Sequence, residues 1–225
     1  MIQESLKKQL ITENGFNWSC ETLKYVGGVD LSFSKNHPSI ACASLLVLDF
    51  QTLDVVYEDF AIVDLTVPYV PGFLAFREAP VLLELIEKMK KSAISSFPQV
   101  LMVDGFGLAC HLGVLADLPT IGIGKSLHHV DGLTQTRVKQ LLQANEDSSS
   151  DIIPLIGDSG STLGAAMRSS EGSSKPIFIS VGHRISLASA IEIVKVSCKY
   201  RVPEPIRQPN ADIRSKSHLR KHGLS

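Results

Sequence analysis

The chain has 225 residues, a formal net charge of −1 and 44% hydrophobic residues. That length suits one domain with a sizeable core, and the near-neutral charge excludes a global positive field, so nucleic-acid binding would need a local basic patch. The charged N-terminus lacks the apolar stretch of a signal peptide, and no apolar run approaches the ~20 residues that cross a bilayer. We therefore expect a protein of the cytoplasm or nucleus.

The first ~20 residues predict an amphipathic helix that leads into the fold. Three apolar runs then predict strands, at 23–33, 39–50 and 53–65. Short polar breaks separate these runs, which is typical of hairpins and favours an antiparallel meander. A helix is expected from near Pro71 to about Ser92, because proline is acceptable in the first turn of a helix.

From residue 99 onward, buried strands alternate with helices. Apolar runs predict strands at 99–103, 120–123 and 177–181, and helices at 108–115 and 187–200. A hairpin region followed by parallel βα units predicts an α/β fold with a mixed sheet flanked by helices. The four cysteines form no C-x-x-C pair, so we interpret them as reduced thiols and not as a disulfide frame or a zinc site.

Two aspartates stand at the ends of apolar strands. Asp30 follows Tyr-Val-Gly-Gly-Val, and Asp104 follows Val-Leu-Met-Val. A buried aspartate costs free energy unless its charge has a partner. Either aspartate alone also suits a helix cap or a turn, but two on separate buried strands favour a shared site.

Glu78 is predicted on the core-facing side of the helix after Pro71. Its neighbours at helical spacing are apolar: Leu74, Leu82, Leu85 and Met89. An inward carboxylate can pair with Arg77 or a buried lysine, but a site shared with Asp30 and Asp104 explains it better. Three carboxylates suit Mg²⁺, with Mn²⁺ as a substitute, because these hard cations prefer oxygen ligands. Such a cluster would hold the cation beside a phosphate.

Lys125 lies in Gly-Ile-Gly-Lys-Ser, which is not a phosphate-binding loop because Pro119 occupies the position of the first glycine. A lysine that follows a strand can still contact a phosphate, although a solvated loop lysine fits equally well. His111, His128 and His129 lack supporting ligands in sequence and are interpreted as surface or supporting residues.

Eight segments, in chain order, resemble the endonuclease V family, which cleaves nucleic acid near hypoxanthine bases. They are VGGVDLSF (26–33), PYVPGFLAFRE (68–78), VDG (103–105), GIGKS (122–126), GDSG (157–160), SVGHRISL (180–187), PEPIR (203–207) and ADIRS (211–215). The segment at 68–78 is the most specific, and the overall run is most similar to plant members.

This resemblance implies a ribonuclease H-like fold with three metal ligands, Asp30, Glu78 and Asp104. It also implies catalytic roles for Lys125 and Asp212. The segment Pro68, Tyr69, Val70 and Pro71 corresponds to the family's strand-separating wedge, in which an aromatic tip fills the gap left by an extruded base. Without the resemblance, Tyr69 would be interpreted as a packed loop aromatic.

The chain departs from the family pattern after Asp104. Members carry a longer glycine-rich loop there, which helps to form the hypoxanthine pocket; here Gly105, assigned to substrate binding, runs directly into Phe106. Roughly eight residues are absent, against ~2–6 in usual βα loops. An insertion near Pro209 can also shift Asp212.

These observations predict a monomeric, metal-dependent endonuclease that acts near inosine in single-stranded RNA or DNA and leaves 3′-hydroxyl and 5′-phosphate ends. Two alternatives stay open: a catalytically impaired nucleic-acid binder with a defective base pocket, and a ribonuclease H-like nuclease of other specificity. The predicted organisation is a helical lead-in (1–22), one catalytic domain (23–215) and a basic tail (216–225).

Overall fold

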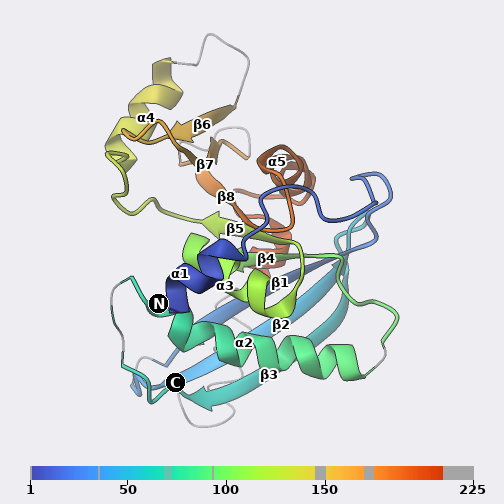
Figure 1. Cartoon of the computed structure of the whole chain (residues 1–225). Coiled ribbons are helices and arrows are strands. Elements are labelled where there is room, and N and C mark those ends of the chain that lie inside the picture. The colour runs from blue at the N-terminus through green and yellow to red at the C-terminus, as the bar shows by residue number, and fades with distance from the viewer. Residues whose placement is uncertain are drawn as a thin grey trace.

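The computed structural model describes residues 2–34, 36–68, 70, 72–92, 94–144, 151–169 and 175–209. Its centre is a mixed sheet of eight strands in the order β3-β2-β1-β4-β5-β8-β7-β6 (Figure 1). The strands are β1 (Tyr25–Phe33), β2 (Ile40–Asp49), β3 (Val55–Asp64), β4 (Val100–Asp104), β5 (Thr120–Gly124), β6 (Ile152–Ile156), β7 (Thr162–Met167) and β8 (Ile177–His183). The helices are α1 (Ile2–Lys8), α2 (Leu74–Lys91), α3 (Phe106–Ala116), α4 (Gln135–Ala144), α5 (Leu187–Val196) and α6 (Glu204–Arg207).

Alternating side chains of the central strands enter two separate cores, one on each face of the sheet. Val29, Leu45 and Val103 pack with the buried residues of α2 and α3. Val26 and Val100 belong to the other core, which includes residues of α5 and α6. Figure 1 shows α2 lying along one face of β1, β2 and β3. The sheet is therefore covered on both faces, as its apolar central strands require.

The strand pairings confirm the expected fold class. β1, β2 and β3 form the antiparallel meander, and β4 joins β1 in parallel, followed by β5. Beyond β5 the sheet returns to antiparallel pairing, because β8 runs against β5 and β7 runs against β8. The elements α4, β6 and β7, which the sequence pattern did not predict, form a lobe with a small core of its own.

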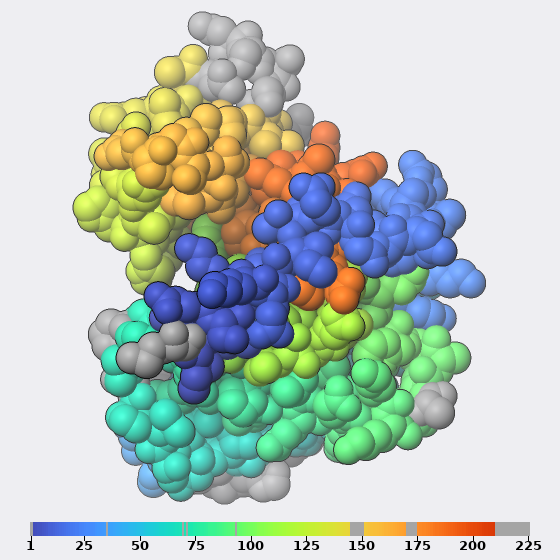
Figure 2. All heavy atoms as spheres, in the orientation of Figure 1, coloured from blue at the N-terminus to red at the C-terminus, as the bar shows by residue number. Residues whose placement is uncertain are grey.

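The N-terminal helix is shorter than expected, because α1 covers only Ile2–Lys8. The following segment is held by hydrogen bonds to the last residue of β8 and the residue after it, instead of by helical bonds. The backbone N–H of Ile11 donates to Nδ1 of His183 (3.3 Å), and Gly15 donates to the carbonyl of Arg184 (3.0 Å). Figure 2 shows this segment crossing the molecular surface between the lobe and the main body.

Gly105 makes a direct turn from β4 into α3. Its φ of 116° belongs to a region that favours glycine, and α3 begins at the next residue. The N–H of Gly105 donates to the carbonyl of Ile123 (2.9 Å), so β5 fixes the turn. The described residues contain no helix long and apolar enough to cross a membrane, and all four cysteines are free, as expected.

Candidate active site

Asp30 and Asp104 lie side by side at the ends of two neighbouring parallel strands. Val29 of β1 is paired with Val103 of β4, and the two aspartates are the next residues along each strand. Asp30 is buried, with 5% of its surface exposed, and Asp104 is half-buried. The sheet register therefore brings together two carboxylates that are far apart in the sequence.

Glu78 approaches these aspartates from α2. It is 7% exposed and follows the core-facing stripe of Ala79 and Leu82, as its helical spacing predicts. Burial raises the pKa of the Glu78 carboxyl to about 7, with further increases from the negative charges of Asp30 and Asp104 and an opposing effect of Arg77. The three predicted carboxylates therefore share one electrostatic environment.

Lys125 follows β5, the strand next to β4, and forms an ion pair with Asp104. Its Nζ lies 2.7 Å from Oδ2 of Asp104, and both side chains are about 30% exposed. This contact decides against the solvated-lysine interpretation. Ser32, which no sequence motif singled out, donates its hydroxyl to Oδ2 of Asp30 (3.2 Å). Its position two residues after Asp30 on the same strand face was the available signal.

The donor set suits a hard divalent cation. Carboxylate oxygens are the ligands that Mg²⁺ prefers, and a cation would offset the repulsion that raises the pKa of Glu78. As they stand, no three His, Cys, Asp or Glu side chains in the described part of the chain are close enough together to hold a metal. Metal binding would thus need a side-chain rearrangement or further ligands, and the assignment of Asp30, Glu78 and Asp104 as ligands stays a prediction.

The remaining predicted residues fall into two groups. Pro68 and Val70 are exposed on the connection between β3 and α2, where an exposed wedge would have to lie. Tyr69, Pro71, Asp212 and the tail 216–225 are outside the described residues. The substrate roles given to Pro68, Val70 and Gly105 stay predictions, as do the domain boundaries.

The histidines lie at the surface or in packing contacts. His128 and His129 are exposed. The ring of His111 packs edge-on against Phe76, with 4.6 Å between centroids, and burial lowers its pKa. His111 therefore belongs to the packing between α2 and α3.

With the carboxylates, the lysine and the fold in place, comparison with known proteins decides the family. The family model for endonuclease V matches residues 4–212. The chain belongs to the endonuclease V family. The resemblance inferred from the motifs is confirmed, and the chain is an endonuclease.

Curated and solved members of the endonuclease V family match nearly the whole chain. Human endonuclease V is 47% identical over 235 residues, covering 97% of this chain and 81% of the relative. The crystal structure of the human protein has a TM-score of 0.90 at 44% identity, covering 99% of this chain and 97% of that one. Endonuclease V from Ciona intestinalis, solved with a 24mer DNA containing an inosine followed by a ribo-adenosine, has a TM-score of 0.91 at 34% identity and covers 98% of this chain and 96% of its own.

The alignment with the human endonuclease V spans more positions, 235, than this chain has residues, 225. The relative therefore carries residues that this chain lacks. The family pattern predicts that the missing residues belong between Gly105 and Phe106, where β4 passes directly into α3.

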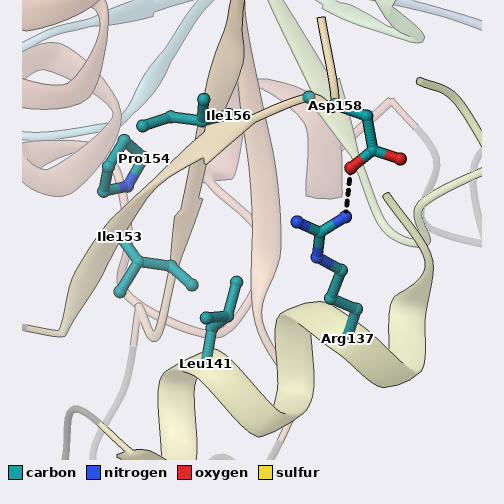
Figure 3. Close-up of a pocket in the computed structure, with 7 residues that line it drawn as sticks. Arg137, Leu141, Ile153, Pro154, Ile156 and Asp158 are labelled. Carbon is teal, nitrogen blue, oxygen red and sulfur yellow. Dashed lines mark hydrogen bonds and ion pairs between the residues drawn. The ribbon is translucent and has the colours of Figure 1, made fainter. Parts of the chain in front are cut away.

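A separate pocket of about 610 Å³ lies between α4 and β6 (Figure 3). Arg137 and Asp158 form an ion pair on one side (2.7 Å), and Leu141, Pro154 and Ile156 supply an apolar side. β6 is the edge strand of the sheet, separated from β4 by three strands. The pocket contains none of the predicted site residues and is distinct from the carboxylate site.

Proposed function

We propose that this chain is a Mg²⁺-dependent endonuclease that hydrolyses a phosphodiester bond near inosine or deoxyinosine in single-stranded RNA or DNA and leaves 3′-hydroxyl and 5′-phosphate ends. The observation that carries the proposal is the sheet register, which brings Asp30 and Asp104 together at the ends of two neighbouring strands; buried Glu78 lies close enough for both charges to raise its pKa. Such repulsion is expected where carboxylates are arranged for a cation. The Ciona intestinalis relative, solved with inosine-containing DNA, supports the choice of substrate.

The residues of the site take three different roles in the proposed reaction. Asp30, Glu78 and Asp104 would hold Mg²⁺, and the bound ion supplies positive charge to the scissile phosphate and the leaving oxygen. Lys125, whose Nζ lies 2.7 Å from Asp104, would donate to a phosphate oxygen. Asp212 is assigned an assisting role through the family resemblance.

The wedge at 68–71 would separate the target base from its neighbours. Val70 and Pro68 are exposed on the loop before α2, and Glu78 lies on that helix. Binding of an extruded base at this loop would therefore bring the adjoining phosphate toward the first turns of α2, which carry Glu78. We further propose that the protein acts as a monomer in the cytoplasm or nucleus.

The test measures cleavage of inosine-containing and matched plain strands of RNA and DNA with and without Mg²⁺. Asp30→Ala and Glu78→Ala should each lower the cleavage rate by at least about a thousandfold, because each removes an electrostatic contact at the reacting phosphate. Glu84→Ala is the matched control, since Glu84 is exposed on the same helix as Glu78. Wild-type rates in either site variant would refute the metal assignment.

A second candidate function is nucleic-acid binding with little cleavage. The direct passage from Gly105 into α3 favours it, because the longer loop of relatives is assigned to the base pocket. Binding of the inosine strand without inosine-dependent cleavage would support this candidate. Cleavage governed by junction geometry and indifferent to inosine would instead support a ribonuclease H-like nuclease of other specificity.

A further inference from the structure

Lys125 lies just beyond the part of β5 that the sheet holds in place. The pairing of β5 with β8 ends at Gly124 and Phe178, and the pairing with β4 ends at Ile123. Lys125 is the next residue after Gly124, so its backbone is outside both ladders. Its amino group nevertheless meets Asp104 at 2.7 Å. Any restraint on the backbone of Lys125 therefore comes from contacts outside these two ladders.

Arg201 supplies that restraint from the segment between α5 and α6. Its Nη2 donates to the carbonyl of Lys125 at 2.6 Å and to the carbonyl of Pro176 at 3.0 Å, and its Nε donates to the carbonyl of Lys175 at 3.1 Å. One guanidinium thus joins the chain just after β5 to the chain just before β8. The planar fork of arginine suits several fixed acceptors at once.

The segment that contains Arg201 is itself fixed by hydrogen bonds. The hydroxyl of Ser169 donates to the carbonyl of Arg201 at 2.5 Å, and the N–H of Glu204 donates to the carbonyl of Ser197 at 2.9 Å. Within the described residues no carboxylate pairs with the guanidinium, so its contacts there are with backbone carbonyls. Among the described residues, the side chain of Arg201 therefore holds two backbone segments together and does not neutralise a carboxylate.

We propose that Arg201 is a positioning residue for the cleavage reaction: its guanidinium fixes the backbone of Lys125 and thereby keeps the Lys125 amino group at Asp104. This inference rests on the proposed role of Lys125 in cleavage. Arg201 does not reach the carboxylates itself; it acts through the carbonyl of Lys125. Because a misplacement of about 1 Å can cost a hundredfold in rate, loss of this restraint should affect cleavage even though the fold survives.

A double-mutant cycle with Lys125 tests the proposal on the full chain. The rate of single-turnover cleavage of an inosine-containing strand is measured with Mg²⁺ for the wild type, Arg201→Ala, Lys125→Ala and the double variant. We expect Arg201→Ala to lower the rate by about tenfold to a hundredfold. In the Lys125→Ala background the same change should cost less than about twofold, because the group that Arg201 positions is already gone.

Two further variants separate positioning from general stabilisation. Arg201→Lys should recover part of the lost rate, since an ammonium can still donate to the Lys125 carbonyl but lacks the fork. Arg137→Ala is the matched control, because Arg137 also donates to a loop carbonyl, that of Gly132 (3.1 Å), far from the site. Arg137→Ala should leave both the cleavage rate and strand binding without Mg²⁺ unchanged.

The possible failures are distinguishable. Wild-type cleavage by Lys125→Ala would remove the proposed role of Lys125 and with it the basis of the inference. Impaired Lys125→Ala together with an unimpaired Arg201→Ala, or equal effects of Arg201→Ala in both backgrounds, would overturn the inference alone. Should Arg201→Ala lower Tm sharply, Arg201→Lys takes its place in the cycle, with the same expectation of a smaller effect in the Lys125→Ala background.

Discussion

At the scale of single residues, Glu78 shows how burial and neighbouring charge act together. The carboxyl lies among apolar side chains of α2, where its ionised form loses hydration, and Asp30 and Asp104 add repulsion. Both effects favour the protonated form, so without a cation the folded protein binds this proton more tightly than the unfolded chain does. The residue is therefore a source of instability that a bound cation would relieve.

Glu78→Gln is expected to stabilise the metal-free protein at alkaline pH. The pKa of Glu78 is raised from 4.5 to about 7, so the cost of ionising it is absent below about pH 4.5, grows as the pH rises and is complete above about pH 7. Glutamine carries no charge at any pH. The Tm of the variant should match that of the wild type near pH 4.5 and exceed it by about 2–4 °C near pH 8, for a cost on the order of 1 kcal/mol.

Thermal unfolding in chelator checks this expectation, with Glu84→Gln as the exposed control on the same helix. Adding Mg²⁺ should then raise the Tm of the wild type and leave that of Glu78→Gln nearly unchanged, because a ligand stabilises only the state that binds it. An equal Tm difference at both pH values would contradict the assignment of the raised pKa to Glu78.

At the scale of elements, α6 is seated on the central strand through Gly28. A methyl group added to Gly28 would lie 1.6 Å from the carbonyl oxygen of Pro205. Gly28 and Asp30 share one face of β1, since side chains alternate along a strand. The helix α6 is therefore anchored to β1 at Gly28, two residues before Asp30.

Gly28→Ala should lower the free energy of unfolding by about 3 kcal/mol, because the added methyl displaces backbone and not a flexible side chain. Urea unfolding measures the change. Gly107→Ala is the control: Gly107 is exposed in α3, and a methyl there meets nothing within 4 Å, so it should be neutral or stabilising by about 0.5–1 kcal/mol. Equal stability of Gly28→Ala and the wild type would show that α6 can shift without cost.

The meander was predictable because short polar breaks separate its apolar runs. The helix α2 and the inward position of Glu78 were predictable because burial imposes a period of 3.6 on helices. β6 contains Pro154 and β7 begins with polar Thr162 and contains Gly164, all of which weaken a strand pattern.

The contacts that complete the site were beyond prediction because they join segments distant in the sequence. The pairing of Lys125 with Asp104 and the bonds from Arg201 to three carbonyls depend on the sheet order β4-β5-β8. The local amino-acid composition does not indicate which backbone carbonyls an arginine side chain will contact. The aspartates were predictable as a pair, but their adjacency required the parallel register.

At the scale of the whole molecule, the chain differs from its relatives in length more than in shape. The fold superposes on human endonuclease V with a TM-score of 0.90, although the sequence alignment contains positions that this chain lacks. Gly105 closes the connection between β4 and α3 without a loop. The fold is therefore retained although this chain lacks residues that the relative carries.

Replacing Gly105 with the longer β4–α3 connection of the human relative should raise the ratio of inosine-dependent to plain-strand cleavage by about tenfold or more. The physical reason is that contacts to the base would then contribute to binding, and hydrogen bonds to a base edge are worth about 1–3 kcal/mol each. A flexible Gly-Ser connection of equal length is the control, and should change neither the ratio nor the stability by more than about 1 kcal/mol. No gain from the human connection would show that base recognition lies elsewhere.

The parallel pairing of β1 with β4 also determines when the site can exist during folding. Val29 and Val103 are paired although β2, β3 and α2 lie between them in the sequence. Contacts between positions so distant in the sequence form slowly, because the intervening chain must first be ordered. No fragment that ends before β4 holds both aspartates. Nuclease activity should therefore return only with the slowest phase of refolding, after the hairpins have regained their secondary structure.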